Sequence, residues 1–121
     1  MPTMKTAPQQ LGQSAEELAV HYFTEHGFSI RARNYRYLRA EIDIIAQKGL
    51  LLVFVEVKAR SNDQFGYPET FVTPRQQALV RAAADHYIIV ADWNHAIRFD
   101  IIAILQQNGS QPQLTHFEDA F

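Results

Sequence analysis

The sequence contains no cysteine in its 121 residues. Disulfide bonds, zinc sites built from thiolates and cysteine nucleophiles are therefore excluded, and the chain does not need an oxidising compartment. Long apolar runs are also missing, because no segment approaches the roughly 18 uninterrupted apolar residues of a membrane-spanning helix. The first ten residues include one lysine and two prolines and lack the apolar stretch of a secretion signal. We expect a cytoplasmic protein with no membrane partner.

Motifs for nucleotide binding and serine hydrolysis are absent as well. The chain has neither a glycine-rich phosphate loop nor a Gly-x-Ser-x-Gly nucleophile turn, which argues against nucleotide kinases and serine hydrolases. Its five histidines show no metal-ligand spacing. The formal net charge is −2, so any surface for nucleic acid must be local.

What the chain does contain is enough apolar material for one ordinary core, since 47% of its residues are hydrophobic and 12% aromatic. We expect a flexible N-terminal leader over residues 1–10 and a single domain over residues 11–121. Apolar residues then recur at helical spacing, which predicts a first amphipathic helix. A capping box of Ser14 and Glu17 would begin this helix, and Gly27 would end it.

The remaining patterns alternate between strand and helix and predict an α/β fold. A strand, a helix and a further strand in that order indicate a parallel crossover beside an antiparallel hairpin, so we expect a central mixed sheet flanked by helices. The long loop before the second helix is a candidate substrate-facing lid. The expected elements are an edge or near-edge strand near 28–33, a hairpin over 41–59 turning at Lys48-Gly49, a loop over 60–73, a helix opened by Thr73 and Pro74 and ending near Asp92, and strands at 97–105 and 114–117.

Charged side chains interrupt the apolar hairpin. With a turn at residues 48 and 49, paired positions sum to 97, so Asp43 lies opposite Phe54 and shares its face with Glu56. Glu41 and Lys58 join that face. The opposite face, made of Ile42, Ile44, Val53, Val55 and Val57, is wholly apolar and would pack against a helix.

Two interpretations of these charges remain open. They form cross-strand ion pairs on an exposed face of the sheet, or they form a metal site. The ratio of three acids to one base favours the metal site, because crowded carboxylates repel one another unless a hard cation such as Mg²⁺ (or Mn²⁺) compensates their charge. Asp43 and Glu56 are then the ligands, the Val57 carbonyl supplies another oxygen, and Lys58 orients or activates a water for phosphodiester hydrolysis.

A basic cluster precedes the hairpin and has the mixture of cations and aromatic rings found on nucleic-acid surfaces. An ordinary solvated strand and loop would have the same composition, so this assignment also stays open. The candidate nucleic-acid-binding residues of this cluster are Arg31, Arg33, Arg36, Arg39, Tyr35 and Tyr37, and Arg60, which follows the hairpin, would extend it.

Several motifs together resemble one known family. The order of an acidic helix, an aspartate and a Glu-x-Lys strand is similar to the PD-(D/E)xK nucleases, which have the restriction-endonuclease-like fold. The individual sequence motifs resemble those of the YraN-like bacterial family, which is itself similar to archaeal Holliday-junction resolvases. This resemblance extends across almost the whole chain. The matching motifs are Leu11-Gly12-x-x-Ala15-Glu16-x-x-Ala19, Asn34-Tyr35-Arg36, Glu41-Ile42-Asp43-Ile44-Ile45, Phe54-Val55-Glu56-Val57-Lys58-x-Arg60, Phe65-Gly66, Arg98-Phe99-Asp100 and the closing His116-Phe117-Glu118-Asp119-Ala120-Phe121.

The resemblance implies a metal-dependent endonuclease acting on DNA, including branched or single-stranded DNA. It also implies that Glu16 is an additional carboxylate near the metal, although Glu16 equally borders an ordinary solvated face of its helix. Glu41 would support the site from behind the ligands or pair with Arg39 or Arg60. The alternative function is a nucleic-acid-binding module that keeps the nuclease scaffold without hydrolysis. A homodimer is open to the chain as well, because symmetric cutting would need two sites related by a twofold axis.

Overall fold

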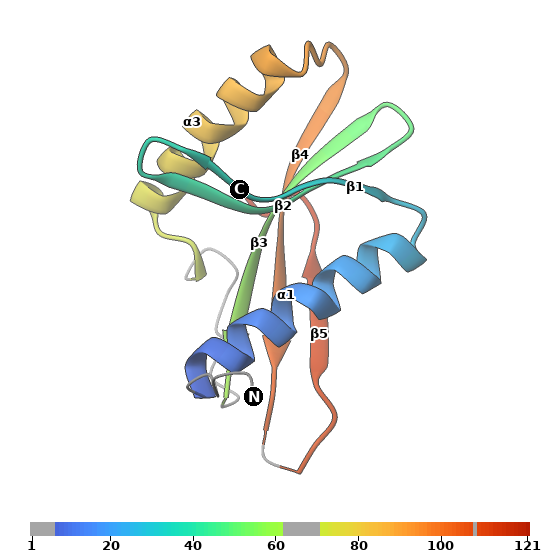
Figure 1. Cartoon of the computed structure of the whole chain (residues 1–121), viewed down its shortest axis with the longest axis vertical. Coiled ribbons are helices and arrows are strands. Elements are labelled where there is room, and N and C mark those ends of the chain that lie inside the picture. The colour runs from blue at the N-terminus through green and yellow to red at the C-terminus, as the bar shows by residue number, and fades with distance from the viewer. Residues whose placement is uncertain (1–6, 62–70, 108) are drawn as a thin grey trace, which may run out of the picture.

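The computed structural model describes residues 7–61, 71–107 and 109–121 (Figure 1). Five strands form one sheet in the order β1-β2-β3-β4-β5, with β3 and β4 parallel and all other neighbours antiparallel. The elements are α1 (Ala7–Glu25), β1 (Ser29–Tyr37), β2 (Ala40–Lys48), β3 (Leu51–Arg60), α3 (Pro74–Val90), β4 (Ala96–Leu105) and β5 (Gln113–Phe117).

Both faces of the sheet are covered. On one face, α1 packs through Ala15, Ala19 and Phe23 onto apolar side chains of β2, β3 and β4. On the other face, α3 packs through Val80, Ala83 and other side chains onto a second set from the same strands. Figure 1 shows the two helices on opposite sides of the sheet. The central strands are buried on both sides, and their sequences are therefore nearly continuous apolar runs.

The chain leaves α1 through a left-handed glycine, as the sequence predicts. Gly27 has a φ of +86°, the Phe28 N–H donates to the Phe23 carbonyl at 3.0 Å, and the Gly27 N–H donates to the Thr24 carbonyl at 3.1 Å. This is the Schellman arrangement, and the rings of Phe23 and Phe28 make its usual apolar contact, with centroids 5.1 Å apart. The predicted start of α1 is wrong, since the helix begins at Ala7 and Ser14 lies inside it.

The start of α3 agrees with its prediction. The Thr73 hydroxyl accepts from the Gln76 N–H at 3.2 Å, and the Gln76 side chain accepts from the Thr73 N–H at 2.9 Å, which makes a reciprocal capping box with Pro74 at the first helical position. The helix ends at Val90, close to the predicted Asp92. Of the loop predicted over 60–73, residues 62–70 lie outside the described part of the chain.

The hairpin register predicted from the sequence is wrong by two residues. Gln47 pairs with Leu52 and Lys48 with Leu51, so Gly49 and Leu50 form the turn. Gly49 supplies a positive φ of 58° in either register, which is why the glycine alone could not decide between them. A shift of two residues preserves the face of every side chain, and Asp43 moves from opposite Phe54 to the level of Glu56.

The predicted division of the hairpin into one charged and one apolar face is also wrong. Ile42 packs in the cluster under α3, whereas Ile44 packs in the cluster under α1. Leu52 and Phe54, which alternate with Val53 and share the face of Glu56, are buried beneath α3. The regular alternation of β2 therefore breaks at Asp43.

The architecture confirms the predicted α/β class, with a mixed sheet built from an antiparallel hairpin and a parallel crossover strand between helices. The first strand is at an edge, as predicted. No helix among the described residues combines the length and apolar character needed to cross a membrane.

Candidate active site at the fork between two strands

The candidate site lies where β2 and β3 part. The two strands pair from Lys48 and Leu51 up to Ile44 and Val55, and the ladder stops there. Beyond this point β2 continues beside β1, whereas β3 continues beside β4 as far as Arg60. Figure 1 shows β2 turning to the left with β1 while β3 descends with β4. The first residues past the last pair are Asp43 and Glu56, so both line the opening of the fork.

A side-chain oxygen of Asp43 accepts a backbone hydrogen bond that a carbonyl of a paired strand would otherwise accept. The Val57 N–H donates to Asp43 Oδ2 at 2.7 Å, which satisfies a backbone group that the diverging strand would otherwise leave unpaired. Burial raises the pKa of Asp43 to about 6, the Val57 hydrogen bond opposes that rise, and the charges of Glu16 and Glu41 add to it. The aspartate is thus fixed in position but poorly compensated in charge.

Glu56 is compensated even less. Its Oε1 atom is buried and has no hydrogen-bond partner among the described residues. Burial, followed by the charge of Asp43, raises the pKa of Glu56 to about 8, with Lys58 acting in the opposite direction. A buried acceptor without a donor costs free energy, so a native structure that retains one usually has a use for it.

Lys58 lies two residues beyond Glu56 on the same face of β3 and is half-buried. Its charge lowers the pKa of both Asp43 and Glu56. No hydrogen bond or ion pair ties its ammonium group to another described residue. The charges of the predicted catalytic trio therefore act on one another at the fork.

The two other predicted acids each have a basic partner. One oxygen of Glu16 accepts from Arg33 Nη2 at 3.2 Å and from Asn34 Nδ2 at 3.0 Å, although Glu16 still lies near enough to raise the pKa of Asp43. Glu41 pairs with Arg36 at 3.3 Å. The predicted pairing of Glu41 with Arg39 or Arg60 is wrong, because the tight β1–β2 turn places Arg36 directly across from Glu41.

The residues of the fork fall short of a complete metal cage. Among the side chains that the structure describes, no group of three from His, Asp and Glu stands close enough to hold an ion. Asp43 and Glu56 are two carboxylates, and a magnesium ion commonly takes only one or two from a protein and keeps several waters. The Val57 carbonyl remains a predicted third ligand.

The basic residues predicted to bind nucleic acid do not form one surface. Arg31 donates to the Tyr87 hydroxyl at 2.7 Å on the α3 side, whereas Arg33 reaches Glu16 on the α1 side. A register shift in β1 between Ile30 and Ala32 accounts for part of this division. Arg36, Arg39 and Arg60 are exposed.

The two tyrosines of this cluster pack against α3. The Tyr35 hydroxyl hydrogen-bonds to the His86 ring, and Tyr37 stacks on the same ring with centroids 4.2 Å apart. Both rings are half-buried. Their presence in a basic stretch is explained by the helix they contact, and nucleic-acid binding by these two residues stays a prediction.

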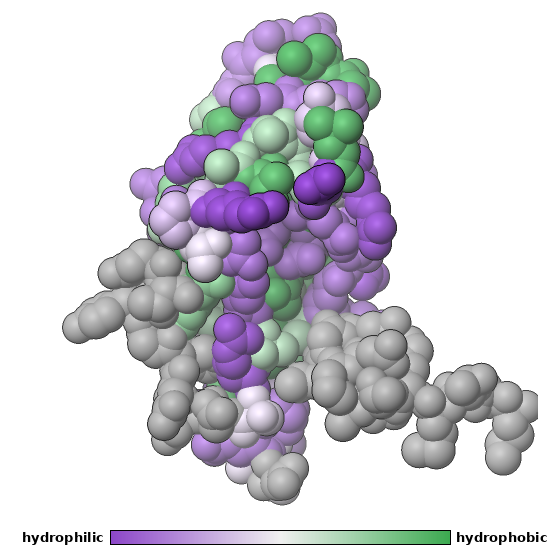
Figure 2. All heavy atoms as spheres, turned by 90° about the vertical axis from the view of Figure 1, so that its left-hand side faces the viewer, coloured by the Kyte–Doolittle hydropathy of each residue, from purple (hydrophilic) through white to green (hydrophobic). Residues whose placement is uncertain are grey.

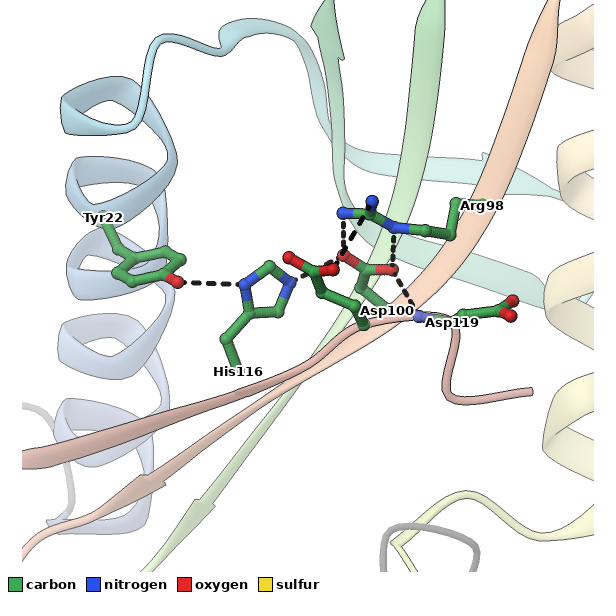
Figure 3. Close-up of polar contacts among 6 residues, drawn as sticks. Tyr22, Arg98, Asp100, His116 and Asp119 are labelled. Carbon is green, nitrogen blue, oxygen red and sulfur yellow. Dashed lines mark hydrogen bonds and ion pairs between the residues drawn. The ribbon is translucent and has the colours of Figure 1, made fainter.

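A second polar cluster lies on the α1 face of β4, where Arg98 and Asp100 stand beside Val53 and Val55 of β3 (Figure 3). Asp100 is completely buried and accepts two hydrogen bonds from Arg98, at 2.8 Å each, and one from the Asp119 N–H at 3.0 Å. His116 Nε2 lies 2.6 Å from Asp100, and its Nδ1 lies 2.9 Å from the Tyr22 hydroxyl. Burial raises the pKa of Asp100, but the hydrogen bonds of His116 and Arg98 outweigh it, and the net shift is downward.

This cluster attaches the C-terminal segment to β4, because His116 and the Asp119 N–H both bond to Asp100. The parts played by Tyr22 and His116 were missed from the sequence, because 94 residues separate them and nothing local in either pattern signals the contact.

A mixed sheet between two helices, opened at a fork that holds two carboxylates and a lysine, defines an α/β protein with a polar candidate site where two strands part. The chain belongs to the group described as "Uncharacterised protein family UPF0102", which matches residues 15–104. This assignment confirms the YraN-like resemblance of the sequence motifs.

Relatives with the family name are similar over almost their full length. A UPF0102 protein of Flavobacterium psychrophilum is 45% identical over 92% of each chain, one of Christiangramia forsetii is 43% identical over 93% of each chain, and one of Chlorobium phaeobacteroides is 41% identical over 98% of each chain. A solved structure, the Holliday junction resolvase Hjc of Archaeoglobus fulgidus, is similar with a TM-score of 0.47 at 13% identity, covering 88% of this chain and 86% of that one.

Proposed function

We propose that this protein is a divalent-metal-dependent endonuclease that hydrolyses phosphodiester bonds in DNA, with its active site at the β2–β3 fork. The observation that carries the proposal is the unsatisfied Oε1 atom of Glu56 beside Asp43. Burial raises the pKa of both half-buried carboxylates, and the charge of Asp43 raises that of Glu56 further. A cation would stabilise the two together, whereas a purely structural pair would need a donor for Glu56 Oε1, and no described residue supplies one.

The donor set fits Mg²⁺ or Mn²⁺. Asp43, Glu56 and the Val57 carbonyl would hold the ion through oxygen, which both ions prefer, and Glu16 would add a carboxylate from α1. When bound, the ion would lower the pKa of a coordinated water and neutralise charge on the phosphate. Asp43 is already oriented for such a role by the Val57 N–H.

The other side chains of the fork have separate roles. Lys58 orients the attacking water and balances the charge that develops on the phosphate, because its ammonium is near both carboxylates and bonded to neither. Glu41 keeps Arg36 at the edge of the fork. Arg60 is exposed and would contact the phosphate backbone of the substrate.

The proposal is tested by incubating the purified protein with single-stranded, flapped, branched and duplex DNA and with RNA, with and without Mg²⁺ or Mn²⁺. Asp43→Asn, Glu56→Gln and Lys58→Met should each reduce metal-dependent cleavage by about a hundredfold or more. Glu17→Gln, which removes an exposed carboxylate next to Glu16, is the matched control and should cleave at the parental rate.

Two results would contradict hydrolysis at the fork. Equal cleavage by the parent and all three variants would place the activity elsewhere. Absence of both cleavage and calorimetric Mg²⁺ binding, with salt-sensitive DNA binding retained, would instead support a nucleic-acid-binding module without hydrolysis.

A further inference from the structure

The turn between β1 and β2 holds an apolar side chain out in solvent. Leu38 is 87% exposed and has a φ of +55°, a conformation that residues with a branched side chain seldom adopt. Glycine or asparagine would fit this backbone with less strain. The exposed leucine is thus an exception in both its backbone and its environment, and such exceptions suggest a role.

An apolar hollow of about 410 Å³ opens beside Leu38, lined by Tyr37, Leu38, Arg39, Ala40, Leu79 and Ala82. The apolar surface continues along the outer face of α3, where Ala78 and Ala82 are exposed and Ile89 is 78% exposed. Figure 2 looks onto this side of the molecule and shows hydrophobic side chains among hydrophilic ones. A protruding apolar side chain and an apolar hollow therefore lie next to each other on one surface.

Charges of both signs border the same surface. Arg39 lines the hollow, Arg75 lies near the start of α3, and Asp85 lies one turn beyond Ala82 on the exposed face of that helix. None of the three is joined by a hydrogen bond or ion pair to another residue within the described ranges. Cations and an acid without partners are therefore available to a molecule that docks here.

We propose that this surface is a twofold interface with a second copy of the chain. In such a dimer, a twofold axis beside the turn would place Leu38 of each copy against the hollow of the other and would bring Asp85 of each copy toward the arginines of the other. A nucleic acid would be disfavoured by Asp85, and it would not need the hollow and the leucine to be complementary. The interface does not include Asp43, Glu56 or Lys58, so it stands whether or not the fork cleaves DNA.

The first test is sedimentation equilibrium of the full chain over a range of concentrations. The parent should shift from 13.9 kDa toward twice that mass as concentration rises. Leu38→Asp and Ala82→Glu should remain monomeric with unchanged circular dichroism, because both positions are exposed in the monomer. Leu50→Asp is the matched control, since Leu50 is 65% exposed in the other hairpin turn, and it should dimerise as the parent does.

The second test uses the absence of cysteine in the chain. A mixture of Leu38→Cys and Ala82→Cys proteins should form a disulfide-linked heterodimer under mild oxidation, in several-fold excess over a mixture of Leu50→Cys and Ala82→Cys proteins. A parent that stays monomeric at every concentration, or Leu38→Asp and Ala82→Glu variants that dimerise like the parent, would overturn the proposal. Equal cross-linking in the two mixtures would overturn it as well.

Discussion

The pKa values of two carboxyl groups, those of Asp100 and Glu56, shift in opposite directions in the folded protein. Asp100 is fully buried, and donors from Arg98, His116 and the Asp119 backbone surround it, so its pKa falls despite the cost of burial. Glu56 is less buried, but one of its oxygens has no donor among the described residues, and its pKa rises to about 8. Asp100 therefore stabilises the fold in its charged form, whereas Glu56 in its charged form destabilises the fold unless a cation is supplied.

This contrast predicts how stability depends on pH. The pKa values of Asp43 and Glu56 are raised to about 6 and about 8, so the folded state binds more protons than the unfolded state between the ordinary carboxyl range and about pH 8. Their contribution to stability is fully present below the unfolded pKa values and is lost as the pH rises through the folded ones. Without metal, Glu56→Gln should be more stable than the parent at pH 8 by on the order of 1 kcal/mol.

Urea denaturation of the parent and Glu56→Gln at several pH values from 4 to 8.5 measures this difference. It should grow with pH, and added Mg²⁺ should stabilise the parent at high pH but not the variant. Glu17→Gln should follow the parent throughout. A difference that is constant with pH would mean that the Glu56 carboxyl is not perturbed by the fold.

At the scale of single elements, the end of α1 depends on one glycine and one lysine. Gly27 adopts a φ of +86°, and a Cβ added there would lie 3.3 Å from Lys48 Cε. Lys48 cannot move away freely, because its Nζ donates to the His26 carbonyl at 2.8 Å and lies over the Phe28 ring. The glycine therefore joins the Schellman turn of α1 to the β2–β3 hairpin.

Gly27→Ala should lower the free energy of unfolding by about 1–2 kcal/mol for the left-handed backbone alone, with a further loss from the Lys48 contact. Gly49→Ala separates the two effects, since Gly49 also has a positive φ but no atom within 4 Å of an added Cβ. Urea denaturation should show the larger loss for Gly27→Ala. Equal losses would show that Lys48 moves aside without cost.

The same elements explain how far the sequence predicts the site. Alternation along β3 placed Glu56 and Lys58 on one face correctly, because a strand has a period of two. The register could not be predicted, since a turn at 48–49 or at 49–50 uses Gly49 equally well. The break at Asp43 could not be predicted either, because it depends on where β2 leaves β3, and that depends on α1 and α3 packing on opposite faces.

At the scale of the whole molecule, the C-terminal segment connects the two helical layers. His116 contacts the Phe23 ring of α1, with centroids 5.2 Å apart. Five residues later Phe121 lies on Phe99, with centroids 5.3 Å apart, and beneath Arg81 of α3. Between them, the Ala120 N–H donates to the Phe99 carbonyl at 2.7 Å. The last residues therefore touch elements on both sides of the sheet.

This connection predicts that Asp100 and Phe121 are energetically coupled, although they lie on different faces of β4. Asp100 fixes the Asp119 N–H and so sets the position of Phe121. Asp100→Asn should cost about 3 kcal/mol by breaking a buried charged pair, and Phe121→Ala about 2 kcal/mol by removing a half-buried ring. The double variant should lose about 1 kcal/mol less than the sum, because a released segment no longer positions the ring.

A double-mutant cycle by urea denaturation measures this coupling. Gly49→Ala combined with Phe121→Ala is the control cycle and should be additive within about 0.5 kcal/mol, since the two sites share no partner. Additivity in the Asp100 cycle would mean that Phe121 reaches its place without the Asp119 hydrogen bond, and the connection between the layers would then rest on the β5 backbone alone.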